Sequence, residues 1–569
     1  MTRFVHESVH RVRTAAVVAA ISSCGLLPAP LLAEDDEDVA TDQSIEEIVV
    51  IGSRLRRRDF SAPSPIATLT REDIEATGQK TLESALSQMP QFIPDFDRTA
   101  NNPGNGRAQI NLRGLGPHRT LVMLNGRRLG PSGIGTAVDV NNLPQALISG
   151  AEIITGGASS VYGSDAVAGI VNFTLREDFD GFGMDISAYS TEKGDSNIYD
   201  LSLAWGHNFA DGRGNVTLFG GYYDREETYA DARAFTSVPW LDNWETGELE
   251  QGGSFSVPEG ALVFPSVDFG NGNTETIFDA DGNPREFSYP EDLYNYAPWN
   301  YLQLPMRRYN GGVILNYDLT DRAELYVEAT YSESSTRRVL APVPTVDFFE
   351  VNYDNPVLTP ITQQFFVDNL IPWTNDTGLG LFRKRLEELG PRISELTSEY
   401  TRLLTGLRGG LGADWEFDAW LTYTRNDEHQ DKLNGASWSR LQQGLLVDPS
   451  TGECFDPSGG CLPVDIFGPG KTSPEAIAFL RQRAMVDVTF RDQFAASGFA
   501  RGELFRNWAG PVEAVIGGEW RKDEGRYVAD ELLLSDDTLG WGADPSVDGE
   551  EQVYELFGEL LVPLAGDVS

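Results

Sequence analysis

The chain has 569 residues and carries 86 acidic against 44 basic side chains, a formal net charge of -42. This length allows several domains. A surface this acidic repels phosphate groups, so nucleic acid is excluded as an expected partner. Beyond the first residues, no run of about 18 is apolar enough to predict a membrane-spanning helix.

The first 33 residues predict an export signal. Arg11 and Arg13 precede a mostly apolar run from Ala15 to Leu32, and a small residue followed by three acids suits cleavage after position 33. An uncleaved membrane anchor is one alternative. A lipoprotein is another, because the residues before Cys24 resemble an acylation site.

A run of β-branched residues, Ile48 to Ile51, lies between acids and a cluster of arginines in residues 34–60. Such residues favour strands, yet this segment precedes any predicted core. We predict a flexible segment whose β-branched run is ready to pair with another strand. The alternative is that the run forms the first strand of the following domain.

Residues 61–178 predict a small α+β domain, because short apolar runs alternate with glycine, asparagine and proline turns. Thr70 is placed to cap a helix, with Asp73 as the capping-box acid and Gly78 at its end. The predicted elements are a strand at 65–69, a helix at 71–76, a second helix capped by Thr81 and closed by Pro90, a strand after the loop at 101–106, a hairpin at Asn125-Gly126, and strands at 151–157 and 168–175.

The glycine-rich stretch at 154–169 lacks the ending of a P-loop and the spacing of a dinucleotide site. The chain has no G-x-S-x-G elbow in this domain. His118 stands alone, as a surface or packing histidine does. We therefore predict tight turns here, and neither a catalytic group nor a metal site.

From Gly181 onward the sequence alternates between apolar and polar residues. In "DWEFDAWLTYTR" one face carries Trp415 and Leu421, and the other carries Glu416 and Thr422. Alternating strands of about ten residues are typical of an outer-membrane barrel. A soluble β-sandwich also alternates, but these strands are long for a sandwich and their connections are asymmetric.

The connections alternate between short and long, as in barrels with periplasmic turns and extracellular loops. Short turns are expected at 210–212, 320–321, 412–413 and 507–508, and long loops at about 227–305, 337–399, 426–490 and 525–550. The pattern gives ten strands, whereas a lumen that holds a domain needs about 22. Because an open sheet in lipid leaves unpaired edges, we expect the front part of a longer protein, either a fragment or a truncated gene product.

Two cysteines, Cys454 and Cys461, remain once the signal is removed. An even pair in an exported chain predicts a disulfide that closes "CFDPSGGC" at the tip of an extracellular loop. A metal clip is the alternative, which the lack of a nearby histidine disfavours.

Three stretches, in this order, resemble TonB-dependent outer-membrane receptors: "EEIVVIGSR", "NLRGLGPHRTLVMLNGRRL" and "ITGGASSVYGSDAVAGIVNF". The resemblance covers the signal, the plug domain and the first part of the barrel. It implies an α+β plug domain at 61–178, followed at 179–569 by about ten of 22 strands of a transmembrane antiparallel β-barrel.

The first of these stretches corresponds to the family's TonB box. The resemblance places the box at Glu47, Ile48, Val49, Val50 and Ile51, and implies that it pairs with TonB in the periplasm as an added strand. Threonine is frequent in the family where this chain has Ile51, and isoleucine also favours a strand.

The resemblance implies active uptake and no catalysis. A scarce large ligand, such as a siderophore, cobalamin or an oligosaccharide, would bind the outer loops and the upper plug loops, and TonB would pull on the box. The implied location is the outer membrane of a Gram-negative bacterium, in contact with lipid and without a cofactor. The upper plug loops, 98–107 and 131–135, supply the candidate ligand residues Arg98, Asn101, Asn102, Asn105, Arg107 and Ser132.

Other functions stay open at this point. The chain could be a non-transporting surface receptor or adhesin, a non-functional truncated receptor, or a secreted hydrolase. Three loop tryptophans, Trp240, Trp244 and Trp299, are suited either to stacking on a ligand or to packing within the loops.

Overall fold

The structure, a computed structural model, describes residues 66–79, 81–102, 104–156, 159–263, 275–412, 414–542 and 545–564. The predicted export signal, the segment 34–60 and the run from Ile48 to Ile51 lie outside these ranges. Within them, no helix has the length and apolar character needed to cross a membrane.

The first part of the described chain forms a five-stranded sheet in the order β1-β4-β5-β2-β3, in which β2 and β5 are parallel and the other pairs are antiparallel. We call residues 66–175 the plug region. Its strands are β1 (Ile66–Thr70), β2 (Thr120–Leu124), β3 (Arg127–Arg128), β4 (Ile148–Thr155) and β5 (Gly169–Leu175), and its α-helices are α2 (Arg71–Ala76), α3 (Leu82–Leu86) and α4 (Ser159–Tyr162).

Two local predictions in the plug region are confirmed. Thr70 accepts a hydrogen bond from the Asp73 amide at 3.2 Å and donates its own amide to the Asp73 carboxylate at 2.9 Å, which completes the capping box. Gly78 follows the helix with a φ of 69°. Asn125 and Gly126 take φ values of 49° and 74° and join β2 to β3 as a hairpin, because both central residues of this turn type need positive φ.

Two other predictions need correction. Thr81 occupies the N-cap position of α3, but its hydroxyl donates to the Glu83 carboxylate at 2.6 Å and caps no backbone amide; the helix ends at Leu86, sooner than expected. The strand expected after the loop at 101–106 is also wrong, because within the described residues this segment pairs only through an isolated bridge between Leu112 and Phe92.

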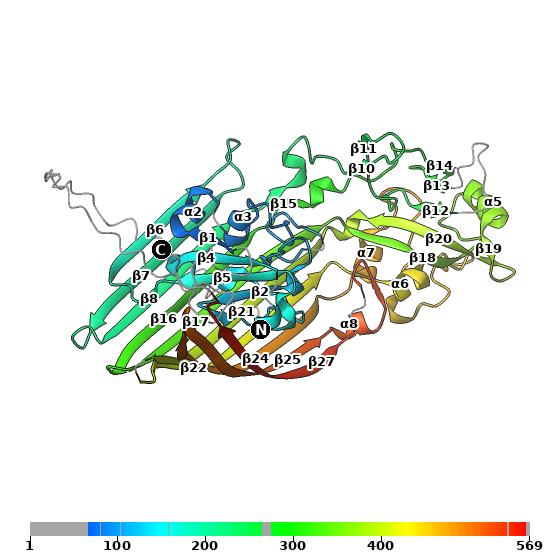
Figure 1. The fold of residues 1–569 in the computed structure, drawn as a ribbon. Helices are drawn as coiled ribbons and strands as arrows, with labels where there is room; N and C mark the ends of the chain where they lie inside the picture. Colours follow the sequence, from blue (N-terminus) through cyan, green and yellow to red (C-terminus); the bar gives the residue numbers. More distant parts are fainter. Residues whose placement is uncertain are drawn as a thin grey trace. The chain divides into compact units, whose positions relative to one another are not determined.

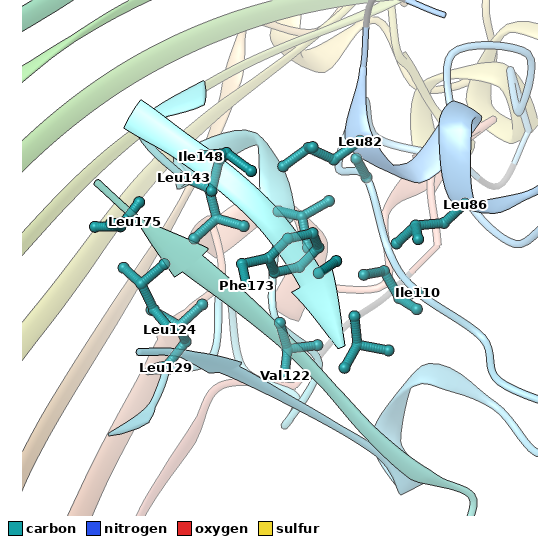
Figure 2. Close-up of a cluster of buried hydrophobic side chains, with 14 of the residues drawn as sticks. Leu82, Leu86, Ile110, Val122, Leu124, Leu129, Leu143, Ile148, Phe173 and Leu175 are labelled. Carbon is teal, nitrogen blue, oxygen red and sulfur yellow. The ribbon is translucent and has the colours of Figure 1, made fainter. Parts of the chain in front are cut away.

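An apolar core lies between the plug helices and the sheet. Figure 2 shows Leu82, Leu86, Val122 and Phe173 among side chains from helices, strands and loops that point toward one another. Burying an aliphatic or aromatic side chain of this size contributes about 1.5–3 kcal/mol. The same cluster includes Ala204, Phe219 and Ile314 from the second sheet, so the plug region is packed against that sheet.

The second sheet has ten antiparallel strands, the number predicted, and Figure 1 shows them side by side from β6 to β27. Its order is β27-β25-β24-β22-β21-β17-β16-β8-β7-β6, with β6 and β27 at its two ends. The strands are β6 (Gly181–Tyr189), β7 (Ile198–Phe209), β8 (Gly214–Arg225), β16 (Met306–Thr320), β17 (Ala323–Leu340), β21 (Arg392–Gly410), β22 (Trp415–Leu433), β24 (Met485–Asn507), β25 (Gly510–Val528) and β27 (Val547–Leu561).

The four short turns fall where predicted, between β7 and β8, β16 and β17, β21 and β22, and β24 and β25. Three of the four long loops are shorter than predicted, because strands such as β17, with 18 residues, and β24, with 23, extend further than expected. Polar residues continue these strands past the apolar band, and the loops lie at 226–305, 341–391, 434–484 and 529–546. We call the two ends of the sheet the turn end and the loop end.

The two faces of the ten-stranded sheet are the reverse of a water-soluble sheet. Leu421 is 60% exposed, whereas Thr422 beside it is 5% exposed. Ile516 on β25 is exposed, while Arg402 and Glu328 are buried. The predicted alternation is therefore confirmed, with the polar face turned toward the plug region and the apolar face turned outward.

The long loops build a compact structure of their own, which the sequence did not predict. Its six-stranded sheet has the order β14-β13-β12-β20-β18, with β19 also pairing with β20. Phe278, Phe366, Phe382 and Phe467 form its centre, with ring centroids 5.2–5.9 Å apart. This loop module comprises β12 (Ala261–Val263), β13 (Glu275–Phe278), β14 (Pro284–Glu286), β18 (Val343–Asn352), β19 (Ile371–Pro372), β20 (Thr377–Leu386), α5 (Pro360–Asn369), α6 (Trp438–Gly444) and α7 (Pro474–Leu480).

Two features secure the periphery of the loop module. Cys454 and Cys461 are joined by a disulfide. At the sheet edge, the side-chain amide of Gln442 donates to the carbonyl of Glu350 in β18 at 3.0 Å and accepts from its amide at 2.9 Å. The remaining short elements of the loops are β9 (Thr228–Tyr229), β10 (Trp240–Asp242), β11 (Leu249–Gln251), β15 (Tyr301–Gln303), β23 (Ala436–Ser437), α8 (Glu531–Leu534) and β26 (Thr538–Leu539).

Candidate functional site

The plug loop at 98–107 lies against the loop end of the ten-stranded sheet. The side-chain amide of Asn101 donates to the carbonyl of Val339 in β17 at 3.1 Å. The carbonyl of Arg98 accepts from the amide of Leu304 at 2.8 Å. Contacts with two different parts of the chain therefore hold this loop in place.

Three further candidate ligand residues make internal contacts. Arg107 forms a two-pronged ion pair with Glu428 of β22, in which Nε lies 3.1 Å from a carboxylate oxygen. Asn105 accepts a hydrogen bond from the Arg107 amide at 3.2 Å. Ser132 is buried and accepts from the side chain of Asn142 at 3.3 Å. Arg107 thus joins the plug region to the sheet, while the bonds of Asn105 and Ser132 lie within the plug region. Only Asn102 among the six candidates is exposed.

The plug region follows β22 along its inner face. The amide of Gly133 donates to the Asn426 side chain at 2.9 Å, one inward position before Glu428. A Cβ atom on Gly130 would lie 2.6 Å from the Thr424 side chain, so the glycine is needed for this close approach. Successive inward residues of one strand thus contact two separate loops of the plug region.

Nearer the turn end, a buried cluster of four charged groups joins the plug region to three strands. Arg127 lies 3.3 Å from Asp418 and 3.9 Å from Glu328, and Arg402 lies 2.6 Å from Glu328. The Arg127 guanidinium is 4.4 Å from the centre of the Tyr326 ring, whose hydroxyl donates to Asp418 at 2.5 Å. Two positive and two negative charges balance, as buried charges require. Sequence reasoning missed this cluster, although Arg127 follows the predicted Asn-Gly turn directly.

A buried carboxylate connects two plug loops. Asp139 accepts hydrogen bonds from the amides of Ala108 and Asn141, each at 3.0 Å. Burial raises the pKa of Asp139 to about 6, and those two bonds oppose the rise. Arg308 of β16 donates to the Asn141 carbonyl at 3.0 Å, which ties the same turn to the large sheet.

Among the cavities that border the plug region, two lie at its opposite ends. One, of about 800 Å³, lies near the turn end, where Arg408 contacts Glu177 at 3.0 Å and Glu324 at 2.7 Å. Another, of about 400 Å³, lies beside the plug loop, and its lining includes Asn101, Asn102, Phe235, Trp240, Tyr296 and Asn300. Among the described residues, no group of three or more His, Cys, Asp or Glu side chains is arranged to hold a metal ion.

The three loop tryptophans have different surroundings. Trp240 of β10 borders the smaller cavity, with its Nε1 donating to the Phe235 carbonyl at 3.1 Å. Trp244, in the turn between β10 and β11, is 92% exposed. Trp299 is half-buried and donates to the Tyr294 hydroxyl at 2.6 Å. Of the three, Trp240 is the one placed at a cavity.

Comparison with known proteins matches residues 58–170 to the TonB-dependent Receptor Plug Domain family model. Among solved structures, a variant of the ferric enterobactin receptor PfeA from Pseudomonas aeruginosa, in complex with enterobactin, is 15% identical with a TM-score of 0.48, and the alignment covers 88% of this chain and 56% of that one. The siderophore receptor PirA from Acinetobacter baumannii is 13% identical with a TM-score of 0.43, covering 81% and 48%.

The ferric citrate transporter FecA, in its unliganded form, is 12% identical with a TM-score of 0.40, covering 87% of this chain and 60% of its own. The chain thus spans about half the length of the solved structures that it matches. The family-model match covers the plug region, whose sheet lies on the polar face of an antiparallel sheet of long strands. Residues 58–170 therefore belong to the plug-domain family of TonB-dependent receptors, and part of an antiparallel β-barrel follows them in the chain.

Proposed function

We propose that the chain acts in TonB-dependent uptake of a ligand across the outer membrane of a Gram-negative bacterium. It acts as a receptor and transporter and changes no bond in its ligand. The observation that carries the proposal is a plug domain packed on the polar face of a sheet whose other face exposes apolar side chains, such as Phe182, Ile186 and Leu556. An apolar outer band is what lipid contact requires of a barrel.

The domain arrangement follows the family. Residues 1–33 act as the export signal, 34–60 as a flexible segment, 61–178 as the plug and 179–569 as barrel strands and loops. The TonB box, Glu47 to Ile51, pairs with TonB by strand addition, in which backbone hydrogen bonds supply the affinity. Force on the box is then transmitted to the plug.

The buried charge cluster gives the plug a contact that can be released. When Arg127 leaves, Glu328 keeps its ion pair with Arg402, and Asp418 keeps the hydrogen bond from Tyr326. Because no carboxylate is left without a partner, the cost of release is smaller than the full penalty of an unpaired buried charge. Water can then replace the guanidinium.

The proposal can be tested without knowledge of the ligand. The full-length protein in detergent is incubated with the purified periplasmic domain of TonB, and capture is measured by pull-down. Val49→Pro removes a strand donor and fixes φ, so capture should be lost. Thr41→Pro places the same change in the flexible segment outside the box and should leave capture intact.

The alternatives predict other outcomes. A surface receptor or adhesin that does not transport, or a truncated receptor without function, would show no specific capture by TonB in the unmodified protein. Equal capture by the Val49→Pro variant and the unmodified protein would show that Ile48 to Ile51 is not the TonB box.

A further inference from the structure

Two spaces lie in line along the inner face of β17 and β21. The larger is the cavity of about 800 Å³ near the turn end, which is bordered by the turn at 320–323, Glu324 of β17 and Arg408 of β21. The smaller is a void of about 10 Å³, enough for one water molecule. Thr330 of β17 and Arg402 of β21 border this void, and both lie nearer the loop end of the same strands.

The β2–β3 hairpin separates the two spaces. Leu124 and Leu129 border the small void, whereas residues 125–128 border the larger cavity. Elsewhere in the described plug region, the segment 138–144 borders only the void, and residues of β4, α4 and β5 border only the cavity. The hairpin is therefore the one continuous stretch of the described plug region that contacts both spaces.

Between the two spaces, the sheet contributes part of the buried charge cluster. Glu328 lies on β17 between the void and the cavity, and it pairs with Arg402 at 2.6 Å and with Arg127 of the hairpin at 3.9 Å. Arg127 is the hairpin residue whose ion pairs reach the sheet, because Arg128 pairs with Asp165 within the plug region. Withdrawal of Arg127 therefore removes the charged contact of the hairpin at the point that divides the two spaces.

The arm of the hairpin that carries Arg127 is the weaker one. β3 is an edge strand of the five-stranded sheet, and among the described strands it pairs only with β2, over two residues. One further backbone bond, from the Leu129 amide to the Val122 carbonyl at 3.2 Å, holds its end. The other arm is held better, because β2 also pairs with β5 and the Asn125 amide donates to the Phe173 carbonyl at 2.8 Å. Local opening starts where the fewest bonds break, which is at β3.

We propose that β3 is a gate on the turn-end side of a passage between the plug region and strands β17 and β21. The inference rests on the proposed uptake function and locates the part of the plug that yields first. When β3 swings out with Arg127, the void and the cavity become one space that reaches the turn end. On the loop side the passage stays closed, since Arg107 keeps its pair with Glu428 and Arg308 keeps its bond to Asn141. The rest of the plug keeps its fold while the gate opens.

The test uses one introduced cysteine in the full-length protein in detergent. Cys454 and Cys461 are joined in a disulfide, so the introduced cysteine supplies the free thiol once the predicted signal is removed. Thr330→Cys places this thiol at the small void. Thr217→Cys places it at a buried position on β8 that borders neither space. The rate of reaction with a small charged methanethiosulfonate reagent is measured for each.

A second substitution opens the gate. With Arg127→Gln, the thiol of Thr330→Cys should react at least tenfold faster, whereas that of Thr217→Cys should change less than twofold. Leu129→Ala widens the void without removing a charge and should accelerate the reaction of Thr330→Cys severalfold. Arg119→Gln is the matched control, because it removes an exposed plug arginine outside the hairpin, and it should leave both rates unchanged.

Two results in detergent would overturn the inference: a rise below tenfold for Thr330→Cys with Arg127→Gln, or an equal rise for Thr217→Cys, which would mean that the whole plug loosens. In cells that express TonB, Thr330→Cys should react faster with the proton gradient intact than after an uncoupler, and Val49→Pro should remove that difference. No difference despite normal TonB capture would reject the gate and leave uptake standing. Loss of TonB capture would reject the proposed function, while the detergent result would still decide whether β3 separates the two spaces.

Discussion

The core of the loop module and the contacts between the plug region and the ten-stranded sheet differ in their chemistry. In the loop module, four phenylalanine rings from β13, β20, α5 and the loop at 445–473 pack edge to face with no charge among them. Between the plug and the ten-stranded sheet, Arg127, Arg107 and Arg308 reach across to carboxylates, amides and carbonyls. The core of the loop module is apolar, whereas the plug adds directional polar bonds to its apolar contacts with Ala204, Phe219 and Ile314 of the sheet.

The difference bears on what each interface can do. Separating an apolar core exposes its whole surface to water at once, which favours a permanent structure. Hydrogen bonds and ion pairs can be exchanged for water one at a time, and each contributes only about 0.5–3 kcal/mol net. The loop module is therefore expected to stay folded when single polar contacts of the plug region open.

The largest effect should follow from opening the apolar core. Phe366→Ala removes a fully buried ring that contacts three others and should destabilise the loop module by about 3–5 kcal/mol. Hydrogen exchange should accelerate in β13 and β20 while the plug strands stay protected. Ile361→Ala, an exposed position on the same helix, is the control and should change little. Equal loss of protection in the plug would mean that the two regions unfold as one.

A smaller effect should appear in the pH dependence of the plug. The folded-state pKa of Asp139 is about 6, above its unfolded value of about 3.9, so ionised Asp139 destabilises the fold. Unfolding free energy should therefore be highest below about pH 4 and fall as pH rises through 6, by about 3 kcal/mol in total for this group.

Asp139→Asn isolates this contribution, because asparagine keeps an oxygen that accepts from Ala108 and Asn141 but does not titrate. The free energy of unfolding of the plug can be measured from pH 4 to 7 by urea unfolding monitored by hydrogen exchange. It should be higher in the Asp139→Asn variant than in the unmodified protein by an amount that rises with pH. A constant difference across this range would show that Asp139 stays ionised in the fold.

The smallest of the three effects concerns the contact of Arg127 with Asp418 and Glu328 in the buried charge cluster. Arg127→Gln removes a charged partner of Asp418 and Glu328 and should weaken plug docking by about 1.5–3 kcal/mol, since both carboxylates keep other partners. Limited proteolysis of the folded protein should cut the plug faster. Arg119→Gln, at an exposed plug arginine, should not change the cleavage rate. Unfolding of the sheet strands in Arg127→Gln would mean that the contact is part of the barrel's stability.

Features set by neighbouring residues were predictable from the sequence. The capping box of Thr70, the Asn125-Gly126 turn and the ten alternating strands each depend on residues a few positions apart, so the pattern determines the structure. Thr81 shows the limit of such reasoning, since a competing acceptor on Glu83 took its hydroxyl.

Features set by distant residues were not predictable. Arg127 and Asp418 are 291 positions apart, and no local pattern links them. The strands of the loop module are short, and β12 pairs with β20 from a different loop. Of the candidate ligand residues, the sequence could not distinguish Asn102, which is exposed, from Arg107, which pairs with the sheet, or Ser132, which is buried within the plug.

The contact of Gln442 with Glu350 has a consequence for encounters between copies of the chain. A β-strand at the edge of a sheet offers its amides and carbonyls to any extended chain that meets it. In β18 the side-chain amide of Gln442 occupies both groups of one residue, as a neighbouring strand would. A strand from a second copy of the chain would first have to displace it. One glutamine thus adds a barrier to strand pairing at this point of the edge.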